Sequence, residues 1–130
     1  MIKWIKKLFA SPTDEIELKI RCLFGFLIDN YDFSFAKIDL GNAVDKDGRF
    51  FFYGPLNAYQ LYNDNICINI LYLVQRQDYD VYITDKYCRD QKYIRNGLEI
   101  PSYLAYDLPR FACEVRAELQ SSKTIFGKDI

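Results

Sequence analysis

The alternation of apolar and polar residues is strongest between positions 66 and 85, where it predicts two adjacent β-strands. Residues 66–74 are almost wholly apolar and rich in β-branched and aromatic side chains, which is typical of a strand covered on both faces. Residues 79–85 alternate instead, so we expect a partner strand with one face toward water. The polar stretch 75–78 between them has the length of a hairpin loop. The inward-facing set is Tyr79, Val81 and Ile83, and the water-facing set is Asp80, Tyr82 and Thr84.

Helical periodicity occurs toward both ends of the chain. Residues 12–29 carry an apolar stripe, with Ser11 as a helix cap and Asp14 near the positive end of the helix dipole. Asp107 is a second candidate cap, and Pro109 suits a first helical turn, where its missing N–H has no partner to lose. The core-facing stripe of this last helix is Leu108, Phe111, Ala112, Val115 and Leu119.

The region between the first helix and the hairpin predicts three shorter strands. Residues 33–40 form one strand whose apolar phase slips midway, which suggests a bulge. Residues 49–53 form a nearly all-aromatic strand that Gly54 and Pro55 are expected to break. Residues 57–63 then resume as an edge-like strand before the central hairpin.

The remaining segments are less regular. An edge strand is expected around residues 92–94, closed by a turn at Asn96 and Gly97, and the tail from Ser121 is expected to be frayed. The connections between strands are too short for parallel crossovers. The predicted fold class is therefore α+β, an antiparallel β-meander of about five strands flanked by N-terminal and C-terminal helices. We expect a single globular domain over residues 1–130.

Composition narrows the classes of function. Half of the residues are hydrophobic and 17% are aromatic, which excludes a disordered chain, and the net charge of −1 does not support non-specific nucleic-acid binding. The chain has no histidine, which removes the usual general base, the triads built on it and most catalytic zinc sites. We therefore expect no catalytic residue, cofactor or metal. A small enzyme that uses carboxylate and tyrosine chemistry, for example at Asp78 and Asp80, stays open as an alternative.

The cysteines bear on the cellular compartment. Cys22, Cys67, Cys88 and Cys113 are scattered without a CxxC pair, so neither a zinc site nor a thioredoxin-like motif is indicated. We expect free, mostly buried thiols in a reducing cytoplasm, with two disulfides as the alternative. The longest apolar run, residues 22–28, is too short to span a bilayer, so no integral membrane segment is expected.

Residues 1–10 form a short basic amphipathic segment, with Lys3, Lys6 and Lys7 opposite or beside an apolar stripe. One interpretation is a first helix that packs this stripe on the core. The other is a peripheral membrane anchor, which would make the chain a small membrane-associated protein.

Tyrosine and aspartate recur at positions that the strand pattern directs toward water. Tyrosine is a favoured interface residue because it offers a large rigid contact with a polar tip, and aspartate complements a basic partner. The alternative is an ordinary half-exposed sheet face. The candidate partner-binding residues are Tyr62, Asp64, Asp78, Asp80, Tyr82 and Asp85.

Two stretches, FFYGPLNAYQLYND (residues 51–64) and INILYLVQRQDYDVYITDKY (residues 68–87), resemble those of small bacterial immunity proteins. These are the inhibitors encoded beside polymorphic toxins, as in contact-dependent growth inhibition. The likeness is in size, acidity, aromatic strands and helix–meander–helix layout, and it involves no diagnostic motif. It implies a cytoplasmic protein that binds the C-terminal domain of a cognate toxin and blocks its active site or substrate surface. Many such toxins are nucleases, and no site residue can be carried over because these interfaces diverge with their toxins.

Overall fold

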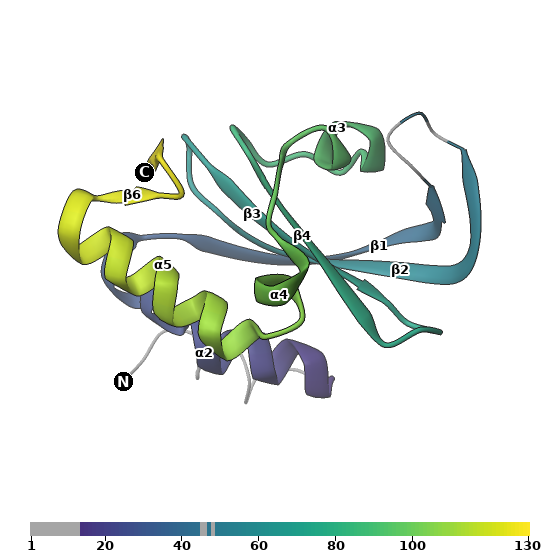
Figure 1. Ribbon diagram of the computed structural model, residues 1–130, viewed down its shortest axis with the longest axis horizontal. Helices are drawn as coiled ribbons and strands as arrows, with labels where there is room; N and C mark the ends of the chain where they lie inside the picture. Colours follow the sequence, from purple (N-terminus) through teal and green to yellow (C-terminus); the bar gives the residue numbers. More distant parts are fainter. Residues whose placement is uncertain (1–13, 45–46, 48) are drawn as a thin grey trace.

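The computed structural model describes residues 14–44, 47 and 49–130, and its central feature is a five-stranded antiparallel sheet (Figure 1). The strand order β1-β2-β3-β4-β5 follows the sequence, so the sheet is a meander, as predicted. With helices before and after the sheet, the predicted α+β class is confirmed. The strands are β1 (Ser34–Val44), β2 (Phe50–Tyr62), β3 (Cys67–Leu73), β4 (Asp78–Thr84) and β5 (Leu98–Glu99).

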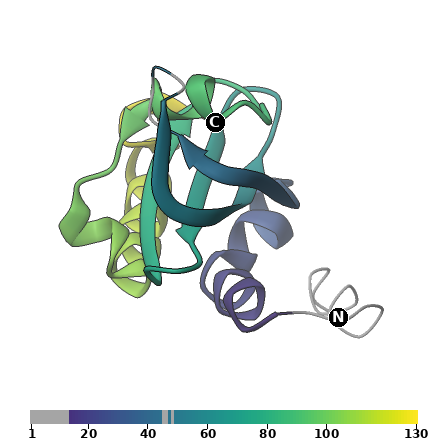
Figure 2. The same ribbon diagram turned by 90° about the vertical axis from the view of Figure 1, so that its right-hand side faces the viewer.

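Helices cover both faces of the sheet. Among the described residues, the long helices α2 and α5 pack on one face, and the short helix α3 covers part of the other (Figure 1 and Figure 2). The helices are α2 (Glu15–Tyr31), α3 (Gln91–Arg95), α4 (Ser102–Ala105) and α5 (Leu108–Ser122). A hairpin of β6 (Thr124–Ile125) and β7 (Lys128–Asp129) follows α5.

The helix predicted over residues 12–29 is α2, and its N-cap is Asp14, whose carboxylate accepts a hydrogen bond from the Glu17 N–H at 2.5 Å. The same carboxylate accepts hydrogen bonds from Lys37 on β1 and from the Tyr59 hydroxyl on β2. Burial raises the pKa of Asp14, but its hydrogen bonds with Lys37 and the Glu17 amide lower that pKa below its ordinary value. This one side chain therefore starts the helix and ties it to two strands. The predicted cap Ser11 lies outside the described residues.

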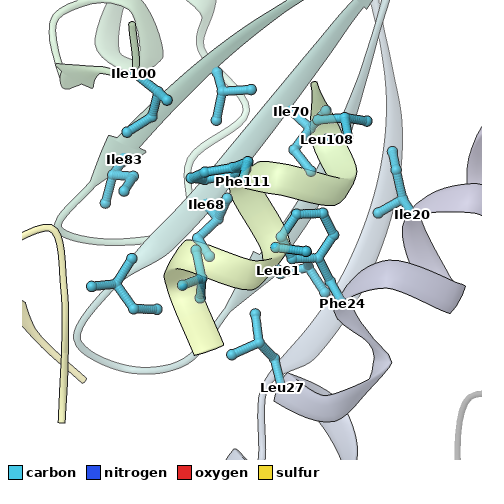
Figure 3. Close-up of a cluster of buried hydrophobic side chains, with 14 of the residues drawn as sticks. Ile20, Phe24, Leu27, Leu61, Ile68, Ile70, Ile83, Ile100, Leu108 and Phe111 are labelled. Atoms are coloured by element: carbon cyan, nitrogen blue, oxygen red, sulfur yellow. The ribbon is translucent and has the colours of Figure 1, made fainter. Parts of the chain in front are cut away.

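The main core lies between the two long helices and the sheet (Figure 3). Phe24 of α2 and Phe111 of α5 are fully buried, with ring centroids 5.6 Å apart, over Ile68 and Ile70 of the central strand β3. The prediction for α5 is confirmed, because Asp107 caps it through the Arg110 N–H. All five residues of its predicted stripe are buried. The prediction that β3 is covered on both faces is also confirmed.

A second, smaller core lies on the opposite face and overturns two predictions. Residues 92–94 belong to helix α3 rather than to an edge strand, and Ile94 of this helix packs into the second core. Tyr82 and Thr84 are therefore 7% and 3% exposed, so the expectation that they face water is wrong. The alternation of β4 is as predicted, but the polar segment after it folds back over the second face.

Helix α3 is joined to β1 by the side chain of Gln91, which is 8% exposed. Its amide Nε2 donates to the carbonyl oxygens of Leu40 and Asn42 at 3.0 and 2.9 Å, and its Oε1 accepts from the Val44 N–H at 2.9 Å. One glutamine thus satisfies three main-chain groups in the far half of β1.

The details of β1 and β2 differ from prediction. Gly54 and Pro55 do not break the strand, because Gly54 adopts a positive φ of 75° and β2 continues through it. The predicted irregularity is present but lies further along the chain: the register is regular from Ser34 to Asp39, and the shifts come after Asp39 rather than midway through residues 33–40. The apparent change of phase arises because both faces of β1 are covered. Phe33 and Phe35 pack into the main core, and Ile38 and Leu40 into the second core.

The structure also corrects the predictions for the C-terminal tail and for the burial of the cysteines. The expected frayed tail instead forms the β6–β7 hairpin, where Ile125 is fully buried. The four cysteines are free, but the expectation that they are mostly buried is wrong, because Cys22 and Cys113 lie on exposed helix positions. The amphipathic segment 1–10 lies outside the described residues. Within the described part of the chain, no helix combines the length and apolar character needed to cross a membrane.

Candidate functional site

The six side chains predicted to bind a partner lie in two groups, one at an end of the sheet and the other, which consists of Asp78, Asp80 and Tyr82, along β4. Tyr62, Asp64 and Asp85 lie where β2 ends, β3 begins and β4 ends. Asp78 begins β4, so it lies roughly 20 Å of strand away from Asp85, at about 3.3 Å per residue. The structure therefore does not bring the six residues onto one surface.

The second group makes contacts within the protein. Arg95 of α3 donates from Nη1 to Asp80 at 3.3 Å and to the Tyr82 hydroxyl at 3.4 Å, and its side chain is 7% exposed. Burial raises the pKa of Tyr82 above its ordinary value. Asp78 forms an ion pair with Arg76 of the preceding loop at 3.2 Å. These contacts hold α3 and the hairpin in place, and Tyr82 can touch a partner only if α3 moves.

Beside the first group, the surface is hollowed to a volume of about 420 Å³. Its walls come from four separate parts of the chain: the end of α2, the start of β1, the β2–β3 turn and residue 130. We call this feature the acidic hollow. Its lining residues are Tyr31, Asp32, Ser34, Tyr62, Asn63, Asp64, Asn65 and Ile130.

The turn that carries Asp64 is fixed by its own hydrogen bonds. Asn63 Oδ1 accepts from the N–H groups of Asn65 and Ile66 at 2.9 and 3.0 Å, and the Asn63 N–H donates to the Ile66 carbonyl at 3.0 Å. Such a side chain that bonds the backbone ahead of it rigidifies a turn. Asp64 is exposed at the tip of this rigid turn.

Two more lining residues are held by local geometry. Asp32 ends α2 in the left-handed conformation, at φ 58°, with its N–H donating to the Leu27 carbonyl. Aspartate is one of the few residues besides glycine that tolerate this conformation. The Tyr62 ring packs against Tyr87 with centroids 4.5 Å apart. The backbone of Asp32 and the ring of Tyr62 are therefore positioned before any partner arrives.

The segment that follows β4 is anchored by polar side chains buried in the sheet. Gln60 Nε2 donates to Asn69 Oδ1 at 2.7 Å and to the Cys88 carbonyl at 2.9 Å. Thr84 Oγ1 accepts from Asn69 and donates to the Lys86 carbonyl at 2.9 Å. These bonds hold residues 85–88 in place, and this segment supplies the Tyr87 ring that packs against Tyr62. Sequence reasoning missed this network, although an isolated amide within an apolar strand is a signal that could have revealed it.

Asp85 belongs to a second, smaller hollow of about 210 Å³. It is highly exposed and forms an ion pair with Lys128 of β7 at 2.9 Å. The hydrogen bond and positive charge of Lys128 lower the pKa of Asp85 below its ordinary value. Lys128 lines this second hollow, and Ile130, two residues later, lines the acidic hollow. The end of the chain thus borders both.

The chemistry of the acidic hollow favours a positively charged group. Of the described residues that line it, two are carboxylates, two are tyrosines and none is basic. Carboxylates form charge-assisted hydrogen bonds with ammonium or guanidinium groups, and tyrosine rings attract cations. Among the residues that the structure describes, no group of three or more His, Cys, Asp and Glu side chains could hold a metal ion.

The chain was also compared with known proteins. No protein-family model, curated protein or solved structure matches it. The assignment of function therefore depends on the residues and geometry described above.

Proposed function

We propose that this protein is an immunity-type inhibitor, which neutralises a cognate bacterial toxin domain in the cytoplasm by binding it. The observation that supports this proposal is the acidic hollow, where Tyr31, Tyr62, Asp32 and Asp64 meet at one end of the sheet on rigid supports. The contact surface consists of the acidic hollow together with the neighbouring Asp85.

This surface suits a basic protein partner. Enzymes that cut nucleic acids grip phosphates with lysine and arginine, so an inhibitor of such a toxin presents carboxylates where phosphates would lie. Exposed charge contributes mainly to the rate of association and the choice of partner. Buried tyrosines contribute most to affinity, because a large ring loses little conformational freedom on binding. Of the six residues predicted from sequence, Tyr62, Asp64 and Asp85 are retained in this surface.

The experiment tests protection and binding together. The toxin candidate is the product of the neighbouring reading frame, expressed in cells with or without this protein. The wild-type protein should rescue growth and co-purify with that product. The double variant Asp32→Asn with Asp64→Asn should fold but lose protection, because the hollow loses both negative charges while asparagine tolerates the left-handed position of Asp32.

A matched control removes the same charge at the other end of the sheet. Asp39→Asn with Asp78→Asn changes two side chains far from the hollow, and asparagine can still accept the Gly41 N–H that bonds Asp39. This control should protect as well as the wild type. Full protection by a correctly folded hollow variant would place the interface elsewhere. A neighbouring product that neither harms cells nor binds this protein would overturn the proposed function.

A further inference from the structure

We propose that the outer edge of β1 accepts an extended segment of the toxin partner as a further strand of the five-stranded sheet. This inference rests on the proposed function for the identity of the partner, and it extends the contact surface beyond the acidic hollow. It follows from the register of β1, which leaves a row of main-chain groups open between residues 34 and 39.

The hydrogen bonds between β2 and β3 decide which groups of β1 are open. The Asn63 N–H donates to the Ile66 carbonyl at 3.0 Å. At the other end of the same ladder, the Val74 N–H donates to the Pro55 carbonyl at 3.1 Å. Bonded and non-bonded positions alternate along an antiparallel pair. The odd-numbered residues of β2 therefore bond β3, and its even-numbered residues bond β1.

The same alternation leaves every second residue of β1 open. The β1 residues that lie opposite even-numbered residues of β2 bond that strand, and they are Ser34, Ala36 and Ile38. The residues between them direct their N–H and carbonyl groups away from β2, and they are Phe35, Lys37 and Asp39. Because β1 is the outermost strand among the described residues, these groups face no other strand of the sheet. The register shifts begin after Asp39, so the regular edge ends there.

The side chain that commonly protects such an edge is turned away from it. An exposed lysine on an edge strand usually discourages pairing with another chain. Here the Lys37 side chain extends back over the sheet, where its ammonium bonds the Asp14 carboxylate and lies 5.8 Å from the centroid of the Tyr59 ring on β2. The open main-chain groups of β1 are therefore left uncovered by it, in the arrangement that a peptide strand needs in order to add to a sheet.

A partner strand suits this edge better than a second copy of the chain does. Antiparallel pairing of two copies through all of their open groups places Phe35 opposite Asp39, and it places Lys37 opposite Lys37. Like charges directly opposite each other destabilise a sheet. A toxin segment has no such constraint. Moreover, Ser34 at the start of this edge also lines the acidic hollow, so a strand along β1 continues directly from the proposed contact surface.

The first test compares Lys37→Pro with Lys37→Ala in the full chain. Proline removes an open N–H and adds a ring at the edge without removing a bond to β2. Alanine removes the same side chain, with its Asp14 contact, and keeps the N–H. Relative to Lys37→Ala, Lys37→Pro should bind the neighbouring product at least about tenfold more weakly and should lose protection. Equal protection by the two variants, both folded by circular dichroism, would overturn the inference and leave the proposed function intact.

Hydrogen exchange followed by NMR tests the wild-type protein directly. In the free protein, the amides of Phe35, Lys37 and Asp39 should exchange quickly, whereas those of Ala36 and Ile38 should be protected by β2. Binding of the neighbouring product should protect the first set. A complex that leaves this set unprotected would contradict the added strand, whatever the variants do.

A blocked peptide with the sequence NAYQLY, that of residues 57–62, tests the edge without the toxin. Within the protein this sequence lies opposite residues 34–39, so as an added strand it meets the same side chains in the same order. N-methylation of its first tyrosine blocks an N–H that points toward β1, and N-methylation of its glutamine blocks one that points toward water.

The unmodified and glutamine-methylated peptides should protect the amides of Phe35, Lys37 and Asp39, with saturation in the millimolar range. The tyrosine-methylated peptide should not. Absent binding, or equal binding of the two methylated peptides, would overturn the inference. Selective binding would support the edge as a strand acceptor even if the neighbouring product proves not to be a toxin. A wild-type dimer that Lys37→Pro dissociates, measured by sedimentation, would assign the edge to a second copy instead.

Discussion

Replacing the buried Asn69 with leucine should destabilise the protein, although leucine is the more hydrophobic residue. Asn69 is fully buried in β3. Its Nδ2 donates to the carbonyls of Cys67 and Tyr82 and to Thr84 Oγ1 at 3.2, 3.1 and 3.0 Å, and its Oδ1 accepts from Gln60 Nε2 at 2.7 Å. Leucine can form none of these bonds.

The expected magnitude follows from these four lost hydrogen bonds; the Cys67 Sγ–H, which also donates to Asn69 Oδ1 at 3.3 Å, is a weak donor and adds little. Each contributes about 1 kcal/mol net, and the buried apolar surface of leucine returns about 2 kcal/mol. Asn69→Leu should therefore lower the free energy of unfolding by about 2 kcal/mol. For a domain of this size, that loss corresponds to a fall in Tm of roughly 6–12 °C. It should also loosen the segment after β4, because Thr84 and Gln60 share their bonds between Asn69 and that segment.

The measurement is urea unfolding followed by circular dichroism, with Gln60→Leu as the matched comparison. Gln60 Oε1 is buried and has no hydrogen-bond partner among the described residues. Leucine at this position loses the two hydrogen bonds of Gln60 Nε2, but it also removes this unpaired oxygen, which is unfavourable in the folded protein. Gln60→Leu should therefore cost less than half as much as Asn69→Leu. An Asn69→Leu protein as stable as the wild type would refute the view that the network stabilises the sheet.

Two further predictions concern acid stability and thiol reactivity. Because the pKa of Asp14 is lower in the folded chain, its stabilisation is complete above the ordinary value of 3.8 and is lost as pH falls through the folded pKa. Asp14→Asn should therefore make the free energy of unfolding depend less on pH at and below that value. Circular dichroism follows the acid unfolding, and an unchanged pH dependence would contradict a lowered pKa for Asp14. A thiol reagent at neutral pH should modify the exposed Cys22 and Cys113 in the native protein, but not Cys67, which is fully buried and whose pKa is raised by burial to about 12. Rapid native-state labelling of Cys67, detected by mass spectrometry, would show that β3 opens readily.

The sequence predicted best the elements whose pattern is local. The apolar run of β3 and the capped stripe of α5 each contain their own signal, and both appear in the structure as expected. Helix α3 could not be predicted in this way, because its five residues are polar apart from Ile94 and Tyr93. Its position depends on Gln91 and Ile94 reaching strands that are far away in the sequence. For the same reason, the burial of Tyr82 could not be read from β4 alone.

The candidate site shows the same limit. Tyr62 and Asp64 were predicted because both lie near the end of one strand pattern. Tyr31 and Asp32 were missed because they end a helix 30 residues earlier and join the hollow only when α2 packs beside the β2–β3 turn. A strand pattern indicates which side a residue faces, but it does not show which other segment will cover that side.

The glutamine that joins α3 to β1 also limits how copies of this protein can associate. An edge strand offers unpaired main-chain groups on which a strand of another molecule can align, and this is a common route to aggregation. In the far half of β1, the groups of Leu40, Asn42 and Val44 are already bonded to Gln91. An incoming strand would have to displace that side chain and the helix that carries it. The length of β1 open to such pairing is thereby reduced to its first half, residues 34–39.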